Sequence, residues 1–184
     1  TVSRTLVMVS GFIPDEQMLM PRGVYYQAAR RWPHMFLTLC PTYMGIAQAA
    51  YDFTVAYLRG DIEGISVKRR MYPTKQITVA DMWIKLQNTW AIFKQATSEA
   101  RVDPSKEDRL RAYAAQYSVM ENANEMCRLA IRTCGGQSML KSLPLEQLYR
   151  DSRLGSLMLP WTAELCLDRL GRETLYEPGE TDDD

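Results

Sequence analysis

The sequence predicts a mainly α-helical protein, in which a four-helix bundle follows a few strands. Two observations carry this prediction. Apolar residues recur at every third or fourth position over three long segments between residues 36 and 134, which is the spacing of one helix face. The first twenty residues are instead rich in β-branched and long apolar side chains, and Gly11 and Pro14 interrupt them, which is typical of strands and turns.

The strand segment comes first, with a turn expected at PDEQ, residues 14–17. Two or three strands cannot bury both of their faces or pair all of their edges. Another chain therefore has to complete the sheet, or the segment packs on the bundle as a remnant.

Three long helices follow. Gly60 and Gly64 end the first helix, and the second begins near Thr74 or Thr78. The third begins after the turn VDPS, where Ser105 is a suitable N-cap and Asp108 stands three residues later, as in a capping box. Such helices suit an antiparallel bundle. The three apolar stripes are Phe36, Leu39, Tyr43, Ile46, Ala50, Phe53 and Tyr57; Val79, Trp83, Leu86, Trp90 and Phe93; and Leu110, Tyr113, Tyr117, Met120, Asn124, Cys127, Ile131 and Cys134.

Two shorter helices are expected at residues 144–153 and 161–171, with Pro160 in the first turn of the last one, where proline is tolerated. The final ETDDD should be a solvated, disordered tail.

Composition narrows the function classes. Lys plus Arg and Asp plus Glu both number 22, so the net charge is zero and nucleic acid is not an expected partner. No apolar run is long enough for a membrane span and no signal peptide is recognisable, so we expect a cytoplasmic protein. The four cysteines form no C-x-x-C pair and His34 is the single histidine, so we expect reduced thiols and no metal site.

Three motifs stand in an order that resembles the acyl-CoA dehydrogenase family. They are GIAQAAYDFTVAYL at 45–58, KRRMYPTKQ at 68–76 and CGGQSMLKSLPLEQLYRDSRLGSLMLPWTAEL at 134–165. They are similar to that family's helix opening, its arginine-aromatic turn, and its glycine pair with the following Arg-Asp helix and active-site loop. The resemblance covers residues 12–172 and concerns the C-terminal half of the family's proteins.

The resemblance implies an FAD-dependent oxidoreductase acting on an acyl-CoA or related substrate. It divides the chain into the end of a middle β domain at 1–22, a C-terminal helical bundle domain at 23–173 and an acidic, disordered tail at 174–184. In this family the flavin lies between subunits. A homo- or hetero-oligomer is therefore expected, with a second polypeptide supplying the N-terminal and β domains.

The same resemblance implies which residues bind FAD. Arg69 matches the arginine that meets the diphosphate, with Lys68 or Arg70 in its place if the register shifts by one, and its planar fork suits a phosphate. Paired glycines allow the dinucleotide to approach the backbone closely. A threonine at a helix N-terminus suits the diphosphate. The full expected set is Arg69, Tyr72, Arg132, Gly135, Gly136, Gln137, Thr162 and Glu164.

The catalytic base is missing from its usual place. Where the family's loop reads Tyr-Glu-Gly-Thr, with the glutamate removing the α-proton, residues 158–162 read Met-Leu-Pro-Trp-Thr, and leucine cannot accept a proton. Some members place the glutamate ahead of the first bundle helix, but residues 34–36 hold no acid either. Pro73 and Ser138 also replace glycines of the family pattern.

Each residue also has a structural interpretation. The basic run around Arg69 can be a solvated turn, and Gly135 with Gly136 can be a helix C-cap. His34 suits a helix start or an interface better than a base. Trp83, Trp90 and Trp161 are expected in the core, and Asp151 and Glu164 are weak candidates for a replacement acid.

Three functions remain, in this order. The first is acyl thioester dehydrogenation by one half of a split enzyme. The second is a flavin monooxygenase of the same fold, which needs no α-proton base and in which the apolar LMLPW loop excludes water. The third is a non-catalytic partner of a true dehydrogenase.

Overall fold

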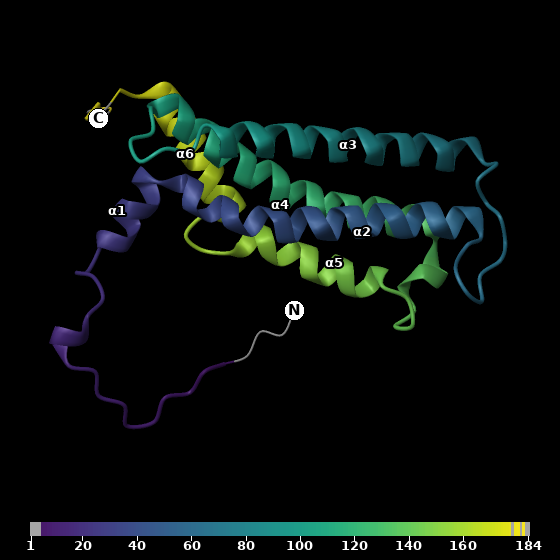
Figure 1. Cartoon of the computed structure of the whole chain (residues 1–184), viewed down its shortest axis with the longest axis horizontal. Helices are drawn as coiled ribbons and strands as arrows, with labels where there is room; N and C mark the ends of the chain where they lie inside the picture. The colour runs from purple at the N-terminus through teal and green to yellow at the C-terminus, as the bar shows by residue number, and fades with distance from the viewer. Residues whose placement is uncertain (1–4, 178, 181, 183–184) are drawn as a thin grey trace.

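The structure is a computed structural model that describes residues 5–177, 179–180 and 182, and it confirms the helical bundle (Figure 1). Six α-helices and four short 3-10 helices (η) occupy the described residues. In chain order they are η1 Asp15–Gln17, α1 Val24–Arg31, η2 Pro33–Leu39, α2 Cys40–Arg59, α3 Pro73–Ser98, α4 Lys106–Cys134, η3 Gly136–Met139, α5 Leu145–Arg153, η4 Leu154–Leu157 and α6 Ala163–Leu175.

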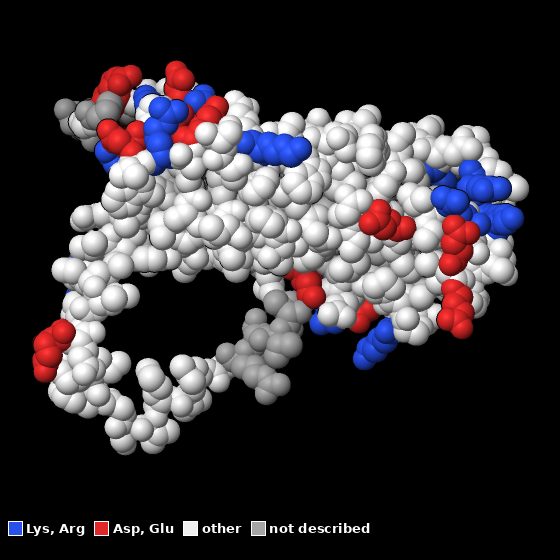
Figure 2. Space-filling view, viewed as in Figure 1, with Lys and Arg blue, Asp and Glu red and all other residues white. Residues whose placement is uncertain are grey.

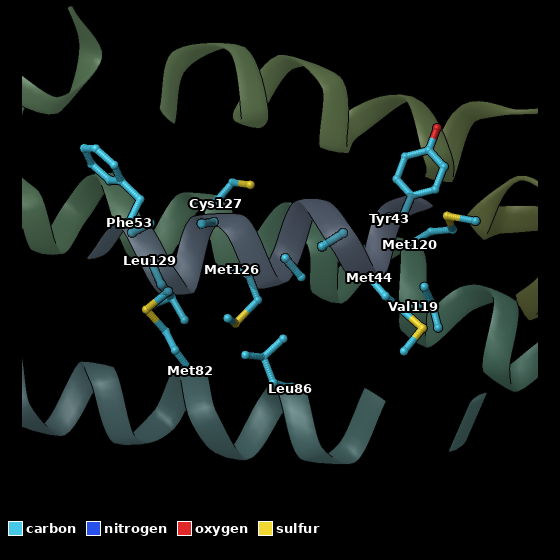
Figure 3. Close-up of a cluster of buried hydrophobic side chains, with 14 of the residues drawn as sticks. Tyr43, Met44, Phe53, Met82, Leu86, Val119, Met120, Met126, Cys127 and Leu129 are labelled. Carbon is cyan, nitrogen blue, oxygen red and sulfur yellow. The ribbon is translucent and has the colours of Figure 1, made fainter. Parts of the chain in front are cut away.

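Helix α4 lies at the centre of the bundle. It packs against α2, α3, α5 and α6, and α5 also packs against α2. Figure 3 shows side chains of α2, α3 and α4 pointing toward one another around Met44, Met82 and Met126, all of which are buried. The flexible thioether side chain of methionine fills irregular gaps between helices.

The capping box at the start of α4 is confirmed. The Ser105 hydroxyl accepts a hydrogen bond from the Asp108 N–H at 3.1 Å, and the Asp108 carboxylate accepts one from the Ser105 N–H at 3.0 Å. Proline at position 73 begins α3, where its missing N–H leaves no helical bond unmade. The family's turn glycine can therefore be replaced here without strain.

The predicted strands are not confirmed. Residues 5–22 contain η1 and no strand, and almost all of them are exposed; in Figure 1 they form an extended arc outside the bundle. Residues 1–4 lie outside the described part. A strand needs a neighbour to pair its N–H and C=O groups, and the described residues offer none to this segment. An isolated bridge between Ile62 and Ile65 is the extent of β pairing among them.

Two predictions are wrong, namely the place of Pro160 in the last helix and the burial of Trp83 and Trp90. Pro160 does not lie in the first turn of the last helix, because α6 begins at Ala163 with Thr162 as its N-cap. Trp83 and Trp90 are 50% and 41% exposed instead of buried, because both stand at the edge of the stripe by which α3 meets its neighbours. Trp161, in contrast, is buried as expected.

The predicted disorder of the acidic tail is untested, because several of its residues lie outside the described part of the chain. Helix α6 extends to Leu175, and beyond it Glu177 pairs with Lys106 at 3.8 Å while the Tyr176 hydroxyl donates to Asp182 at 2.6 Å. Pro178, Thr181, Asp183 and Asp184 lie outside the described residues. Among the helices that the structure describes, none has the length and apolar character needed to cross a membrane.

Candidate functional site

Six of the eight residues expected to bind FAD lie at one end of the bundle. The end of α2, the start of α3 and the end of α4 meet there, because successive long helices run antiparallel. Figure 2 shows Lys and Arg side chains gathered at this end, where α2 and α3 are joined. The six residues are Arg69, Tyr72, Arg132, Gly135, Gly136 and Gln137.

Arg69 is held by the connection between α2 and α3. Gly60 ends α2 in a left-handed conformation, and a Cβ at this position would lie 2.7 Å from the Ser66 carbonyl oxygen, so only glycine fits. The returning chain then lets the Arg69 N–H donate to the Leu58 carbonyl at 2.8 Å. The guanidinium carbon lies 5.0 Å from the centre of the Tyr57 ring, a cation–π arrangement.

Tyr57 links Arg69 to the glycine pair. Its hydroxyl donates to the side-chain oxygen of Gln137 at 3.3 Å, although its ring is buried at the end of α2. Arg69, Tyr57 and Gln137 therefore form one continuous polar chain across this end of the bundle. The sequence placed Tyr57 only in the core stripe, and nothing in its spacing indicated the second role.

The glycine pair both ends α4 and leaves room above it. Gly135 has a φ of 90°, which disfavours side chains, and a Cβ built on Gly135 or Gly136 would meet no atom within 4 Å. Ser138, in place of the family's glycine, is buried and its hydroxyl donates to the Gly135 carbonyl at 2.7 Å. The substitution therefore stabilises the turn and leaves the open surface unobstructed.

A pocket of about 300 Å³ lies between the first turn of α3 and the last turn of α4. Lys75 reaches across it and hydrogen-bonds the Thr133 carbonyl, while Arg132 is exposed at its side. Two cations and hydroxyl groups beside a helix start favour an anion such as phosphate. The lining residues are Thr74, Lys75, Thr78, Leu129, Arg132 and Thr133.

A second, more apolar groove of about 400 Å³ lies between α2 and α3. Arg70 lines it, whereas Arg69 faces Tyr57, so the two adjacent arginines serve different surfaces. Trp83 stands beside Tyr51 in this groove, with ring centres 5.8 Å apart, which explains its exposure. Sequence reasoning missed this groove, because a residue that lines a groove and a core residue share the same helical spacing.

Tyr72 is 52% exposed and occupies the N-cap position of α3, with its ring available to a ligand at this end.

Thr162 and Glu164 lie elsewhere. Thr162 caps α6, and its hydroxyl oxygen accepts from the Leu165 N–H at 3.3 Å. The residue before it, Trp161, packs on Tyr113 in the N-terminal part of α4. Tyr113 and Gly135 are separated along α4 by about 33 Å at 1.5 Å per residue. One copy of the chain therefore cannot bring the two groups of residues to the same diphosphate.

The loop before α6 carries no proton acceptor on its side chains. Leu157 and Leu159 are 53% and 71% exposed. Glu164 is exposed in the first turn of α6, where a backbone N–H and the Thr162 hydroxyl hold its pKa below the usual range. Asp151 lies in the last turn of α5. Burial raises the pKa of Tyr43, and the charge of Asp151 raises it further.

The surroundings of His34 and of the four cysteines are those of residues that pack inside a fold. Burial lowers the pKa of His34 against the opposing charges of Asp108 and Glu99, and neither ring nitrogen has a hydrogen-bond partner among the described residues. All four cysteines are free and buried, and burial raises the pKa of the Cys40 thiol to about 12. Within the described residues, no three His, Cys, Asp or Glu side chains are grouped to hold a metal ion.

The family described as acyl-CoA dehydrogenase, C-terminal domain, matches residues 22–159, well over half of the chain. This chain belongs to that family. The bundle domain and the open glycine turn at the end of α4 are thus parts of a known fold, which the resemblance in the sequence had indicated.

The chain is similar to two relatives with different names and to one solved structure. The chain is 29% identical to the caffeyl-CoA reductase-Etf complex subunit CarC of Acetobacterium woodii over 113 residues, 60% of this chain and 28% of that protein. It is 28% identical to the L-evernosamine nitrososynthase of a Micromonospora species over 154 residues, 76% of this chain and 34% of that protein. The structure of KijD3 with FMN and a dTDP-linked sugar matches with a TM-score of 0.63 and 25% identity, covering 76% of this chain and 35% of that one. The chain spans about a third of the length of these proteins.

Proposed function

We propose that this chain contributes the bundle half of a composite FAD site in an oxidoreductase of acyl-CoA dehydrogenase type. The observation that carries the proposal is that the expected FAD residues fall into two groups. One group lies beside the C-terminal end of α4, and the other lies at the start of α6, beside the N-terminal part of α4. A site between two copies reunites them: one copy provides Arg69, Arg132 and the glycine pair, and the other provides Thr162.

The residues at the glycine end fit a dinucleotide. Open space above Gly135 and Gly136 permits close approach of a ligand to the backbone. The exposed Arg132 and the pocket beside Lys75 suit phosphate oxygens, and the apolar α2–α3 groove suits a flat ring. FAD, when bound, would accept a hydride from the substrate.

The acyl thioester reaction also needs a proton acceptor. The loop residues Leu157 and Leu159 cannot serve, and the lowered pKa of Glu164 makes it a poor base. We therefore assign the base to the second polypeptide that supplies the N-terminal and β domains. The relative CarC, named as a subunit of a caffeyl-CoA reductase-Etf complex, supports both a CoA-linked substrate and the existence of partner chains.

A second candidate is a flavin-dependent monooxygenase. The observation that favours it is the loop itself, which presents leucines where dehydrogenation needs a carboxylate. The relative named L-evernosamine nitrososynthase matches more of this chain than CarC does, and its name indicates a substrate other than an acyl-CoA. An apolar loop would exclude water from reduced flavin, and no α-proton base would be needed.

The composite site can be tested by mixing two variants. Arg69→Gln and Thr162→Val each remove one half of the site, so each alone should weaken FAD binding at least tenfold in a fluorescence titration. Mixed after dissociation and reassembly, unlike copies should regain one intact site per pair, or about a quarter of all sites for random two-fold pairing. The exposed Asn88→Ala on α3 serves as the control that leaves binding unchanged.

The titration uses the chain with any polypeptide that co-purifies with it. Absence of FAD binding, or loss in both variants without recovery on mixing, would overturn the proposal. Reduction of the bound flavin by an acyl-CoA supports dehydrogenation, whereas oxygen consumption that requires NADH or a reductase supports the monooxygenase.

A further inference from the structure

The connection between α5 and α6 is fixed to the bundle at two points. At Gly155, an added Cβ would lie 2.4 Å from the Met120 sulfur and 2.8 Å from the Tyr43 ring, so the backbone is pressed against the core. At Trp161, the indole is only 5% exposed, and its centre lies 4.7 Å from that of the Tyr113 ring. Between these two residues Leu157 and Leu159 are exposed, whereas Ser156 and Pro160 are buried.

Tyr113 is itself firmly placed. Its hydroxyl donates to the Arg30 carbonyl at the end of α1, at 3.2 Å. Burial raises the pKa of Tyr113, so the hydroxyl keeps the proton that it donates. Trp161 therefore packs where α1, α4 and α6 meet, in a cluster with Ala29 and Cys166.

This position corresponds to a hydrophobic staple. Thr162 is the N-cap of α6, so Trp161 precedes the cap and Cys166 is the fourth residue of the helix. An apolar residue before the N-cap that packs with the fourth helical residue fixes the angle at which the chain enters the helix. The members of this staple are buried together with Tyr113.

We propose that Trp161 is a positioning residue that fixes the N-terminus of α6. It thereby fixes the Thr162 hydroxyl and the backbone amides of the first turn of α6. It does this by filling the space between α4 and α6, and it touches no reacting atom. The proposal deepens the proposed function and rests on it in one respect, namely that Thr162 meets the flavin diphosphate.

Shape, not hydrogen bonding, is what Trp161 contributes. Its indole nitrogen is buried, yet no acceptor among the described residues lies within hydrogen-bond distance. A phenylalanine can therefore replace it with a smaller aromatic surface on Tyr113, whereas alanine would leave a cavity and release the helix start.

The test measures hydrogen exchange at two amides of the first turn of α6. The Leu165 N–H donates to the Thr162 hydroxyl at 3.3 Å, and the Cys166 N–H donates to the Thr162 carbonyl at 3.0 Å. Trp161→Ala should speed exchange at both amides at least tenfold, while Trp161→Phe should stay within a factor of three of the wild type. Met82→Ala, a cavity between α3 and α4, controls for general loss of stability.

A parallel FAD titration separates this proposal from the proposed function. If the wild type binds FAD, Trp161→Ala should weaken binding at least tenfold, with recovery in Trp161→Phe and little change in Met82→Ala. If the wild type binds no FAD, the proposed function fails, and the exchange result alone decides whether Trp161 holds the helix start. Equal exchange in Trp161→Ala and Met82→Ala, or weak FAD binding in Trp161→Phe, would overturn the positioning role.

Discussion

Ser105 and Asp108, at the start of α4, form a hydrogen-bonded pair that the sequence predicted. Asp108 is buried and accepts the Ser105 N–H, and this bond lowers its pKa, with Arg101 and Arg111 adding to the effect. The spacing of Ser105 and Asp108 was enough to predict the pair, because both partners lie within one helical turn. Tyr57 shows the opposite case, since its partner Gln137 is far away in the sequence.

We expect Asp108→Asn to lower the melting temperature at pH 7. Because the folded-state pKa of Asp108 is depressed, its contribution to stability is fully present above the unfolded value of about 3.9 and is lost as the pH falls through the folded value. The gap between variant and wild type should therefore close below about pH 4, as followed by thermal melts across the pH range. Asp168→Asn, which breaks an exposed pair with Arg172, should cost less than about 0.5 kcal/mol.

At the scale of elements, the helices were predictable and their junctions were not. Helices α2, α3 and α4 follow the three apolar stripes closely, because a stripe records which face must be buried. The start of α6 was misplaced at Pro160, since the sequence does not show that Trp161 turns into the core before the helix begins.

Two glycine substitutions should have opposite effects. Gly155→Ala places a methyl group against Met120 and Tyr43 and should destabilise the fold by about 1–3 kcal/mol, the usual cost of overpacking. Gly171→Ala, within α6 and with open space around it, should stabilise by about 0.5–1 kcal/mol. Urea unfolding gives both values, and a stable Gly155→Ala would show that the contact with α4 is loose.

At the scale of the whole molecule, the N-terminal segment stands apart from the bundle. Leu6, Val9, Phe12 and Leu19 are more than 80% exposed, which is unusual for so many apolar side chains in one stretch. Almost all of residues 5–22 are exposed and they lie outside the bundle in Figure 1, so the bundle core does not depend on them.

Deletion of residues 1–22 should leave the bundle folded. Far-UV circular dichroism should keep its helical signal, and the melting temperature should change little, because almost all of residues 5–22 are exposed. A large fall in melting temperature would show that the segment packs on the bundle, which is the alternative that the sequence left open.

The sequence by itself determined the helices of the bundle and the capping box, because helix periodicity and short motifs record local physics. Its resemblance to the acyl-CoA dehydrogenase family named the FAD-site candidates, and the tertiary structure brought six of them to one end of the bundle. Only the tertiary structure decided that Thr162 and Glu164 lie far from those six, that Trp83 borders a groove, and that Trp161 anchors the start of α6. These features depend on where along α4 the other helices pack and on which side chains lie between them. Such distances follow from long-range packing, which no local pattern of residues encodes.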